Sequence, residues 1–188
     1  QLLATSPINI KSTAKKARGL RHFVNHNNDL LIFGPAGQFR FDGRVPITPA
    51  SSAMPQAASY TTTTTAEPKA AGNDIFFATT YGESAGLSQF SLDPQIENLS
   101  VAQPMADDQI GLMKGNIVDI ETSPNLGIVF VRMDGTGTGE GDSARNRIFV
   151  LEFEPRIDIL KPIEPTWSWW SLDHGVNIID MYADEDTL

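Results

Sequence analysis

Short runs of apolar, β-branched and aromatic residues, separated by glycine- and proline-rich turns, dominate the second half of the chain. Each run is about as long as one β-strand. The four runs are Asn116–Ser123, Gly127–Asp134, Arg147–Glu154 and Thr166–Leu172. Successive strands separated by turn residues predict an antiparallel meander, the unit from which a β-propeller blade is built.

The first half of the chain predicts further strand pairs joined by turns. The pairs are Asp29–Phe33 with Gln38–Phe41, across the turn Gly34–Gly37, and Asp74–Thr80 with Leu87–Leu92, across residues 81–86. Residues 44–72 are rich in proline, alanine and threonine and predict a long connector, in which the β-branched run Thr61–Thr65 suits an edge strand. A single short helical turn is expected within residues 98–113, limited by Pro104.

These elements predict an all-β fold of antiparallel meanders, a β-propeller-like platform segment with long loops. About nine or ten strands would form two to three blades, whereas propellers close with about 4 to 8 blades. Either further sequence completes such a ring, or the sheets pack as a sandwich. We expect an N-terminal hairpin region with its connector at residues 1–72 and a meander region at residues 73–188. The chain does not begin with Met, and we expect it to be a fragment of a longer protein.

Composition narrows the function. The 188 residues carry a net charge of −9, which disfavours a phosphate-gripping surface of clustered Lys and Arg. The chain has no cysteine and therefore neither disulfides nor a thiolate metal site. No apolar stretch approaches the length of a membrane-spanning helix, so we expect no membrane insertion by this segment. No cofactor is expected.

Charge is unevenly distributed, and this asymmetry supplies candidate contact residues. The first 28 residues contain bases and no acid: Lys11, Lys15, Lys16, Arg18 and Arg21. Residues 173–188 contain acids and no base: Asp173, Asp180, Asp184, Glu185 and Asp186. Such complementary stretches suit contacts between subunits, although each also fits an ordinary solvated surface.

Three tryptophans, Trp167, Trp169 and Trp170, form the other candidate contact surface. On a strand, Trp167 and Trp169 share one face and Trp170 lies on the other. We expect Trp167 and Trp169 to be buried packing residues and Trp170 to lie at a subunit interface. A sugar-stacking platform is the alternative.

Other patterns that resemble chemical sites have simpler explanations. The sequence GTGTGEG at 135–141 lacks the lysine and helix of a phosphate loop and reads as a flexible hairpin loop. Calcium ligation by Asp134, Glu140 and Asp142 matches no defined spacing. The pairs Asp119 with Glu121 and Glu152 with Glu154 alternate with apolar residues, as on a half-solvated strand.

The two histidines of the segment HFVNH, His22 and His26, would share one face of a strand. We expect both to be exposed to solvent or to lie at an interface. The candidate site residues therefore comprise no catalytic, cofactor-binding or metal-binding residue.

The order of short motifs resembles that of a known family. The motifs are Leu20-Arg-His-Phe-Val, Asp29-Leu-Leu-Ile-Phe, Gly37-Gln-Phe, Ile47-Thr-Pro, Gly72–Ala78, Ala102–Asp107, Gly115–Ile120 and Thr166-Trp-Ser-Trp-Trp, with Tyr60 and Pro68 between them. This succession resembles the central part of the tail nozzle protein of short-tailed bacteriophages, also called tail tubular protein B.

The resemblance implies a structural component of the virion rather than an enzyme. It implies a homo-oligomeric ring, a hexamer, through which DNA is ejected, with a propeller-like platform. The implied partners are the tail adaptor ring protein and the tail fibre protein, with duplex DNA passing without specific binding. Two alternatives stay open: a β module that binds cell-surface glycan, and a cell-wall or polysaccharide hydrolase using Glu152 or Asp119.

Overall fold

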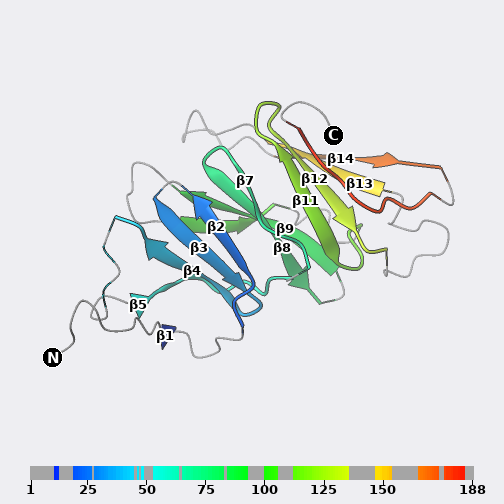
Figure 1. Ribbon diagram of the computed structural model, residues 1–188. Helices are drawn as coiled ribbons and strands as arrows, with labels where there is room; N and C mark the ends of the chain where they lie inside the picture. Colours follow the sequence, from blue (N-terminus) through cyan, green and yellow to red (C-terminus); the bar gives the residue numbers. More distant parts are fainter. Residues whose placement is uncertain are drawn as a thin grey trace. The chain divides into compact units, whose positions relative to one another are not determined.

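The computed structural model describes residues 11–12, 19–26, 28–44, 46, 48, 53–63, 65–82, 84–92, 100–105, 112–135, 147–153, 165–173 and 176–184. Regular structure in these residues consists of β-strands alone, arranged as three four-stranded sheets and one two-stranded sheet (Figure 1). The predicted all-β class is therefore confirmed. The chain divides into two compact units, residues 1–62 and residues 63–188. The described residues contain no helix of the length and apolarity that crossing a membrane requires.

The first unit contains one antiparallel four-stranded sheet, here called the β2–β6 sheet. Its strands are β2 (His22–His26), β3 (Asp29–Gly34), β4 (Gly37–Asp42) and β6 (Gln56–Ala58), in that order. Ile32, Phe39, Phe41 and Met54 form its apolar cluster. Separately, β1 (Lys11–Ser12) and β5 (Ala53–Met54) form a two-stranded parallel sheet.

The predicted hairpin of β3 and β4 is confirmed, with a turn shorter than expected. Gly34 lies opposite Gly37, so only Pro35 and Ala36 form the loop. Glycine at position 37 leaves room for the neighbouring strand, because a Cβ there would lie only 3.0 Å from the backbone oxygen of Ala58.

The second unit begins with the β7–β10 sheet. Its strands are β7 (Lys69–Ala71), β8 (Asp74–Tyr81), β9 (Ser84–Leu92) and β10 (Ser100–Pro104), and consecutive strands pair in antiparallel fashion. The predicted pairing of β8 with β9 is confirmed. Strand β9 starts three residues earlier than expected, and Tyr81 pairs with Ser84, so the connection between the strands is shorter than predicted. Gly82 has a φ of 65°, in the left-handed region that favours glycine.

The β11–β14 sheet contains the four predicted runs in chain order. Its strands are β11 (Ile117–Ser123), β12 (Ile128–Met133), β13 (Arg147–Glu152) and β14 (Thr166–Ser171). All pairings between neighbours are antiparallel, with an irregularity in β11 between Ile117 and Asp119. The predicted meander is therefore confirmed. A closed ring of blades is not seen in the described residues.

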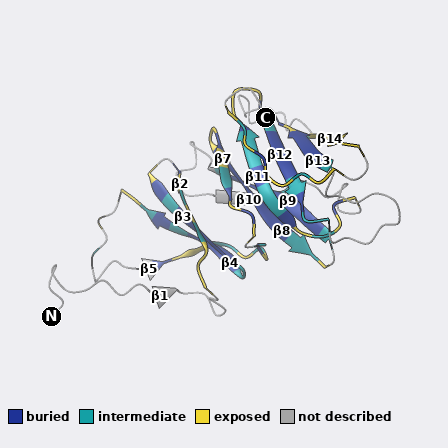
Figure 2. Ribbon diagram, turned by 45° about the vertical axis from the view of Figure 1, so that its right-hand side comes forward, coloured by how far each residue is buried: buried dark blue, intermediate teal, exposed yellow. Residues whose placement is uncertain are grey.

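One apolar core joins the two sheets of the second unit. Phe76 and Leu87 from the β7–β10 sheet share it with Ile120, Val131 and Phe149 from the β11–β14 sheet. Strands β8, β9, β11, β12 and β13 are mostly buried or half-buried, whereas most of β14 and the turn residues 72–73, 82 and 124–126 are exposed (Figure 2). The two meanders are thus packed face to face, as sheets that each bury one apolar face must be.

Two irregular segments differ from expectation where the structure describes them. In the segment 98–113, for which a short helical turn was expected, residues Ser100–Pro104 form β10, which gains its hydrogen bonds by pairing with β9, while residues 98–99 and 106–111 lie outside the described residues. Pro104 is tolerated because it ends an edge strand. The connector at residues 44–72 is also less irregular than expected, since it contains β5, β6 and β7. Among the described residues of the threonine run, only Thr62 takes part in a β-bridge.

Candidate assembly surface

Trp167 anchors β14 to the core of the second unit. It lies opposite Leu151 in the ladder and packs against the core shared by the two sheets. Its indole Nε1 donates a hydrogen bond of 2.7 Å to the backbone oxygen of Met105. The expected packing role of Trp167 is therefore confirmed, although the residue is half-buried rather than buried.

The other two tryptophans remain on the surface. Trp169 and Trp170 are each 49% exposed. The expectation that Trp169 is buried was therefore wrong. Its ring lies beneath the guanidinium of Arg147, with 5.9 Å between the guanidinium carbon and the ring centroid. Trp170 packs one side against Phe130, with ring centroids 5.5 Å apart.

The C-terminal segment 176–184 lies across the opposite face of the β11–β14 sheet from the shared core (Figure 1). Ile178 and Met181 pack onto Phe130, Ile148 and Val150. In the same segment, the side chains of Ile179 and Tyr182 are exposed to solvent, at 85% and 74%. We call the exposed side chains of Trp169, Trp170 and Leu172, together with those of Ile179 and Tyr182, the aromatic margin.

The aromatic margin is only partly the surface that the sequence indicated. The sequence analysis did not indicate Leu172, Ile179 and Tyr182 as contact residues. They are apolar residues in or beside an otherwise acidic stretch, and this contrast in polarity could have pointed to them. Among the acids of that stretch, Asp173, Asp180 and Asp184 are exposed, while Glu185 and Asp186 lie outside the described residues. The margin is thus apolar with acidic surroundings.

Asp119 helps to hold the C-terminal segment in place. Burial raises the pKa of the Asp119 carboxyl above its ordinary value, against the opposing effect of the Arg132 guanidinium. The charge of Asp180 raises it further. Arg132 Nε lies 3.6 Å from Asp119 Oδ2, and Arg132 Nη1 donates to the backbone oxygen of Ile178 at 3.4 Å.

Two of the four carboxylates considered for hydrolysis, Asp119 and Glu121, are engaged in ion pairs. Asp119 faces Arg132, and Glu121 Oε1 lies 3.1 Å from Lys69 Nζ. Partial burial lowers the pKa of Lys69, but the hydrogen bond and charge of Glu121 outweigh this effect and the pKa is raised. Glu152 is exposed on β13, and its companion Glu154 lies outside the described residues.

The described residues contain no group of three or more His, Asp or Glu side chains arranged to hold a metal ion. Of the calcium candidates, Asp134 accepts hydrogen bonds from Asn116 at 3.0 and 2.7 Å, which close the open end of the β11–β12 hairpin. Glu140, Asp142 and most of the glycine-rich loop lie outside the described residues.

Of the basic candidates, the structure describes Arg21 and the backbone of Lys11. Arg21 is exposed directly before β2, and its backbone N–H donates to Phe33 O at 2.9 Å. Phe23 and Leu20 are also exposed, at 57% and 40%. The backbone of Lys11 lies in β1, whereas Lys15, Lys16 and Arg18 lie outside the described residues.

The histidines of β2 share a face, as predicted, but they are not both exposed. His22 is half-buried and His26 is 5% exposed, so the expectation for His26 was wrong. His26 lies opposite Asp29 in the ladder. Its Nε2 is buried and makes no hydrogen bond to the described residues.

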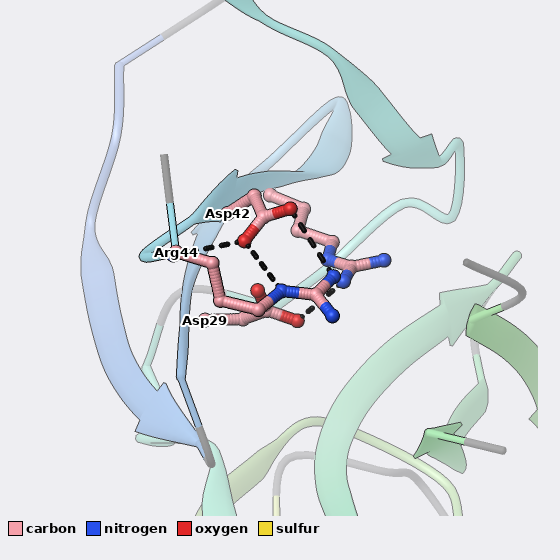
Figure 3. Close-up of polar contacts among 4 residues, drawn as sticks. Asp29, Asp42 and Arg44 are labelled. Atoms are coloured by element: carbon pink, nitrogen blue, oxygen red, sulfur yellow. Dashed lines mark hydrogen bonds and ion pairs between the residues drawn. The ribbon is translucent and has the colours of Figure 1, made fainter. Parts of the chain in front are cut away.

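Charged side chains close the end of the β3–β4 hairpin next to His26. Asp29 Oδ2 lies 2.6 Å from Arg40 Nη2, and both carboxylate oxygens of Asp42 accept from Arg44, at 3.0 and 3.2 Å (Figure 3). The hydrogen bonds of Arg44 lower the pKa of the Asp42 carboxyl. Gly43 N–H adds a backbone bond of 2.7 Å to Asn28 O. This cluster has a structural use in fixing the hairpin base.

Comparison with known protein families gives a match. The family described as bacteriophage nozzle protein matches residues 1–188, the whole chain. The comparison with curated proteins gave no match.

Proposed function

The chain belongs to the bacteriophage nozzle protein family, and from this premise we propose that it forms part of the ring-shaped conduit through which DNA is ejected into the host. Membership makes the chain a structural component of the virion, located in the phage tail and part of the tail assembly. The match over the whole chain is the observation that carries the proposal.

The charge of the chain supports a passive conduit. A wall with net negative charge repels the phosphate backbone over about one Debye length, roughly 8 Å at physiological salt. With a net charge of −9, the chain can border a channel without gripping the duplex. A surface that binds DNA would instead need clustered Lys and Arg side chains. The described residues do not present such a cluster on one strand or sheet face.

The partners follow from the same premise. We propose a homo-oligomeric ring, sixfold in number, that contacts the tail adaptor ring protein and the tail fibre protein. The basic residues Lys11, Lys15, Lys16, Arg18 and Arg21 and the tryptophans Trp167, Trp169 and Trp170 are the proposed contact residues. Paired sheets with exposed margins suit such an assembly, because neighbouring subunits can cover them.

The structure weakens one basis of the glycan-binding alternative. A stacking platform of Trp167 and Trp169 needs both rings open to a sugar, but Trp167 packs on the core and its N–H is already engaged. The family is one of structural tail proteins, which favours a non-enzymatic role over hydrolysis.

Electron-microscopy class averages of the assembled protein test the proposal. We expect rings with a central channel, and duplex DNA should show no saturable binding at physiological salt. Reversal of two basic charges, Lys15→Glu with Lys16→Glu, should impair ring formation, and added salt should weaken association of the wild type. Tight, salt-sensitive DNA binding that the double variant abolishes would contradict the passive conduit.

A further inference from the structure

Each four-stranded sheet of the described residues has two edge strands, and two of these, β14 and β2, have complementary surroundings. In the β11–β14 sheet, β14 pairs with β13 alone, and in the β2–β6 sheet, β2 pairs with β3 alone. A strand at a sheet edge leaves alternate backbone N–H and C=O groups unpaired, which makes it a template for another strand.

The side chains beside these two edges are complementary. Next to β14, the exposed apolar side chains of Trp169, Trp170 and Leu172 adjoin the exposed carboxylate of Asp173. Next to β2, the exposed apolar side chains of Leu20 and Phe23 flank the exposed guanidinium of Arg21. One edge is therefore apolar and acidic, and the other is apolar and basic.

We propose that the β14 edge of one copy of the chain docks on the β2 edge of a second copy. Main-chain hydrogen bonds between the edges would continue one sheet into the next, and the aromatic side chains would cover each other's apolar surface. The opposite charges of Asp173 and Arg21 would favour this pairing over the pairing of two β14 edges. Two β14 edges would bring the Asp173 carboxylates of the two copies close together, and like charges repel.

Because the two edges are different surfaces, the contact is head-to-tail. Such a contact generates a ring if the rotation between copies closes, and an open filament if it does not. The inference thus rests on the proposed ring and specifies which surfaces join its subunits.

The absence of cysteine allows a direct crosslinking test. Single variants of the full chain with Ser168→Cys or Ser171→Cys on β14 are mixed with variants carrying Phe23→Cys or Asn25→Cys on β2, all at exposed positions. A short bis-maleimide should give at least tenfold more mixed dimer than the same β2 variants give with Asn125→Cys, an exposed residue in the β11–β12 turn. Unchanged melting of each variant checks its fold.

The outcomes separate this inference from the proposed function. Mixed dimers above the control support the inference, and if the particles are filaments rather than rings, the proposed ring alone is wrong. Rings by electron microscopy without crosslinks above the control overturn the inference and leave the ring intact. Monomers without crosslinks contradict both.

A charge exchange provides a second measurement. Asp173→Arg and Arg21→Asp should each weaken association about fivefold, as expected for loss of one exposed ion pair. A mixture of the two variants should form dimers again through their reversed charges. A mixture as weak as either variant by itself would count against the pairing of these edges.

Discussion

The first and last strands of the β11–β14 sheet are both edge strands, yet their surroundings differ. Strand β11 lies against β7, where Glu121 forms an ion pair with Lys69 and Thr122 Oγ1 donates to Ala70 O at 3.1 Å. Besides its pairing with β13, strand β14 is anchored by the hydrogen bond from Trp167 to Met105 O. Its other two tryptophans, Trp169 and Trp170, remain half exposed. Similar β-forming residues thus build one edge strand that contacts another strand of the chain and one whose aromatic side chains stay half exposed.

The largest expected effect distinguishes two tryptophans of one strand. Trp167→Ala should destabilise the fold by about 3–5 kcal/mol, because it empties a packed aromatic site and removes the indole hydrogen bond to Met105 O. Trp169→Ala should cost only about 1 kcal/mol, because much of its ring stays in water. Urea unfolding of both variants measures the difference. Equal losses would mean that the inner and outer parts of β14 do not differ as described.

A smaller effect is expected at the contact between β7 and β11. Lys69→Met should destabilise by about 1–2 kcal/mol at neutral pH, because it leaves the mostly buried carboxylate of Glu121 without its cation. Ser168→Val on the open β14 edge is the matched control and should stay within about 0.5 kcal/mol of the wild type. If the two variants lose equal stability in urea, the contrast between the edges fails.

The pH dependence sharpens the same comparison. The pKa of Lys69 is raised in the folded protein, so the protonated amine is favoured by folding. Its contribution is fully present below the unfolded value near 10.5 and is lost as pH rises through the folded value. The stability difference between wild type and Lys69→Met should therefore shrink above about pH 10.5. A difference that stays constant to higher pH would exclude the ion pair as its source.

The strands could be predicted because burial of alternate or continuous apolar residues is local information. The four runs of the β11–β14 sheet and the hairpin at residues 29–42 show this. Strand β10 could not be predicted, since its stability comes from pairing with β9, and neither could the strand residues Ser84, Ala85 and Gly86. The predicted region boundary at residues 72 and 73 stays a prediction.

The sequence predicted which tryptophans belong to the candidate surface, but it did not predict how far each of them is exposed to solvent. Alternation correctly placed Trp167 and Trp169 on one face, yet it could not reveal that close packing reaches Trp167 and leaves Trp169 half exposed. Alternation likewise does not reveal that His26 is buried while His22, on the same face, is half-buried. The acidic and basic stretches were evident from the sequence, and their role in contacts stays a prediction.

The smallest expected effect concerns the C-terminal segment beside the aromatic margin. Burial raises the pKa of Asp119, so the folded protein favours its protonated form and stability from this group falls as pH rises through the unfolded value near 3.8. Asp119→Asn removes that titration. Its stability relative to wild type should therefore increase between about pH 3 and pH 6, measured by thermal unfolding at low salt. Asp173→Asn, at an exposed position, controls for general charge effects. A relative stability that instead decreases with pH would show that the ion pair with Arg132 outweighs burial, and that the segment is held by charge rather than by the packing of Met181 and Ile178.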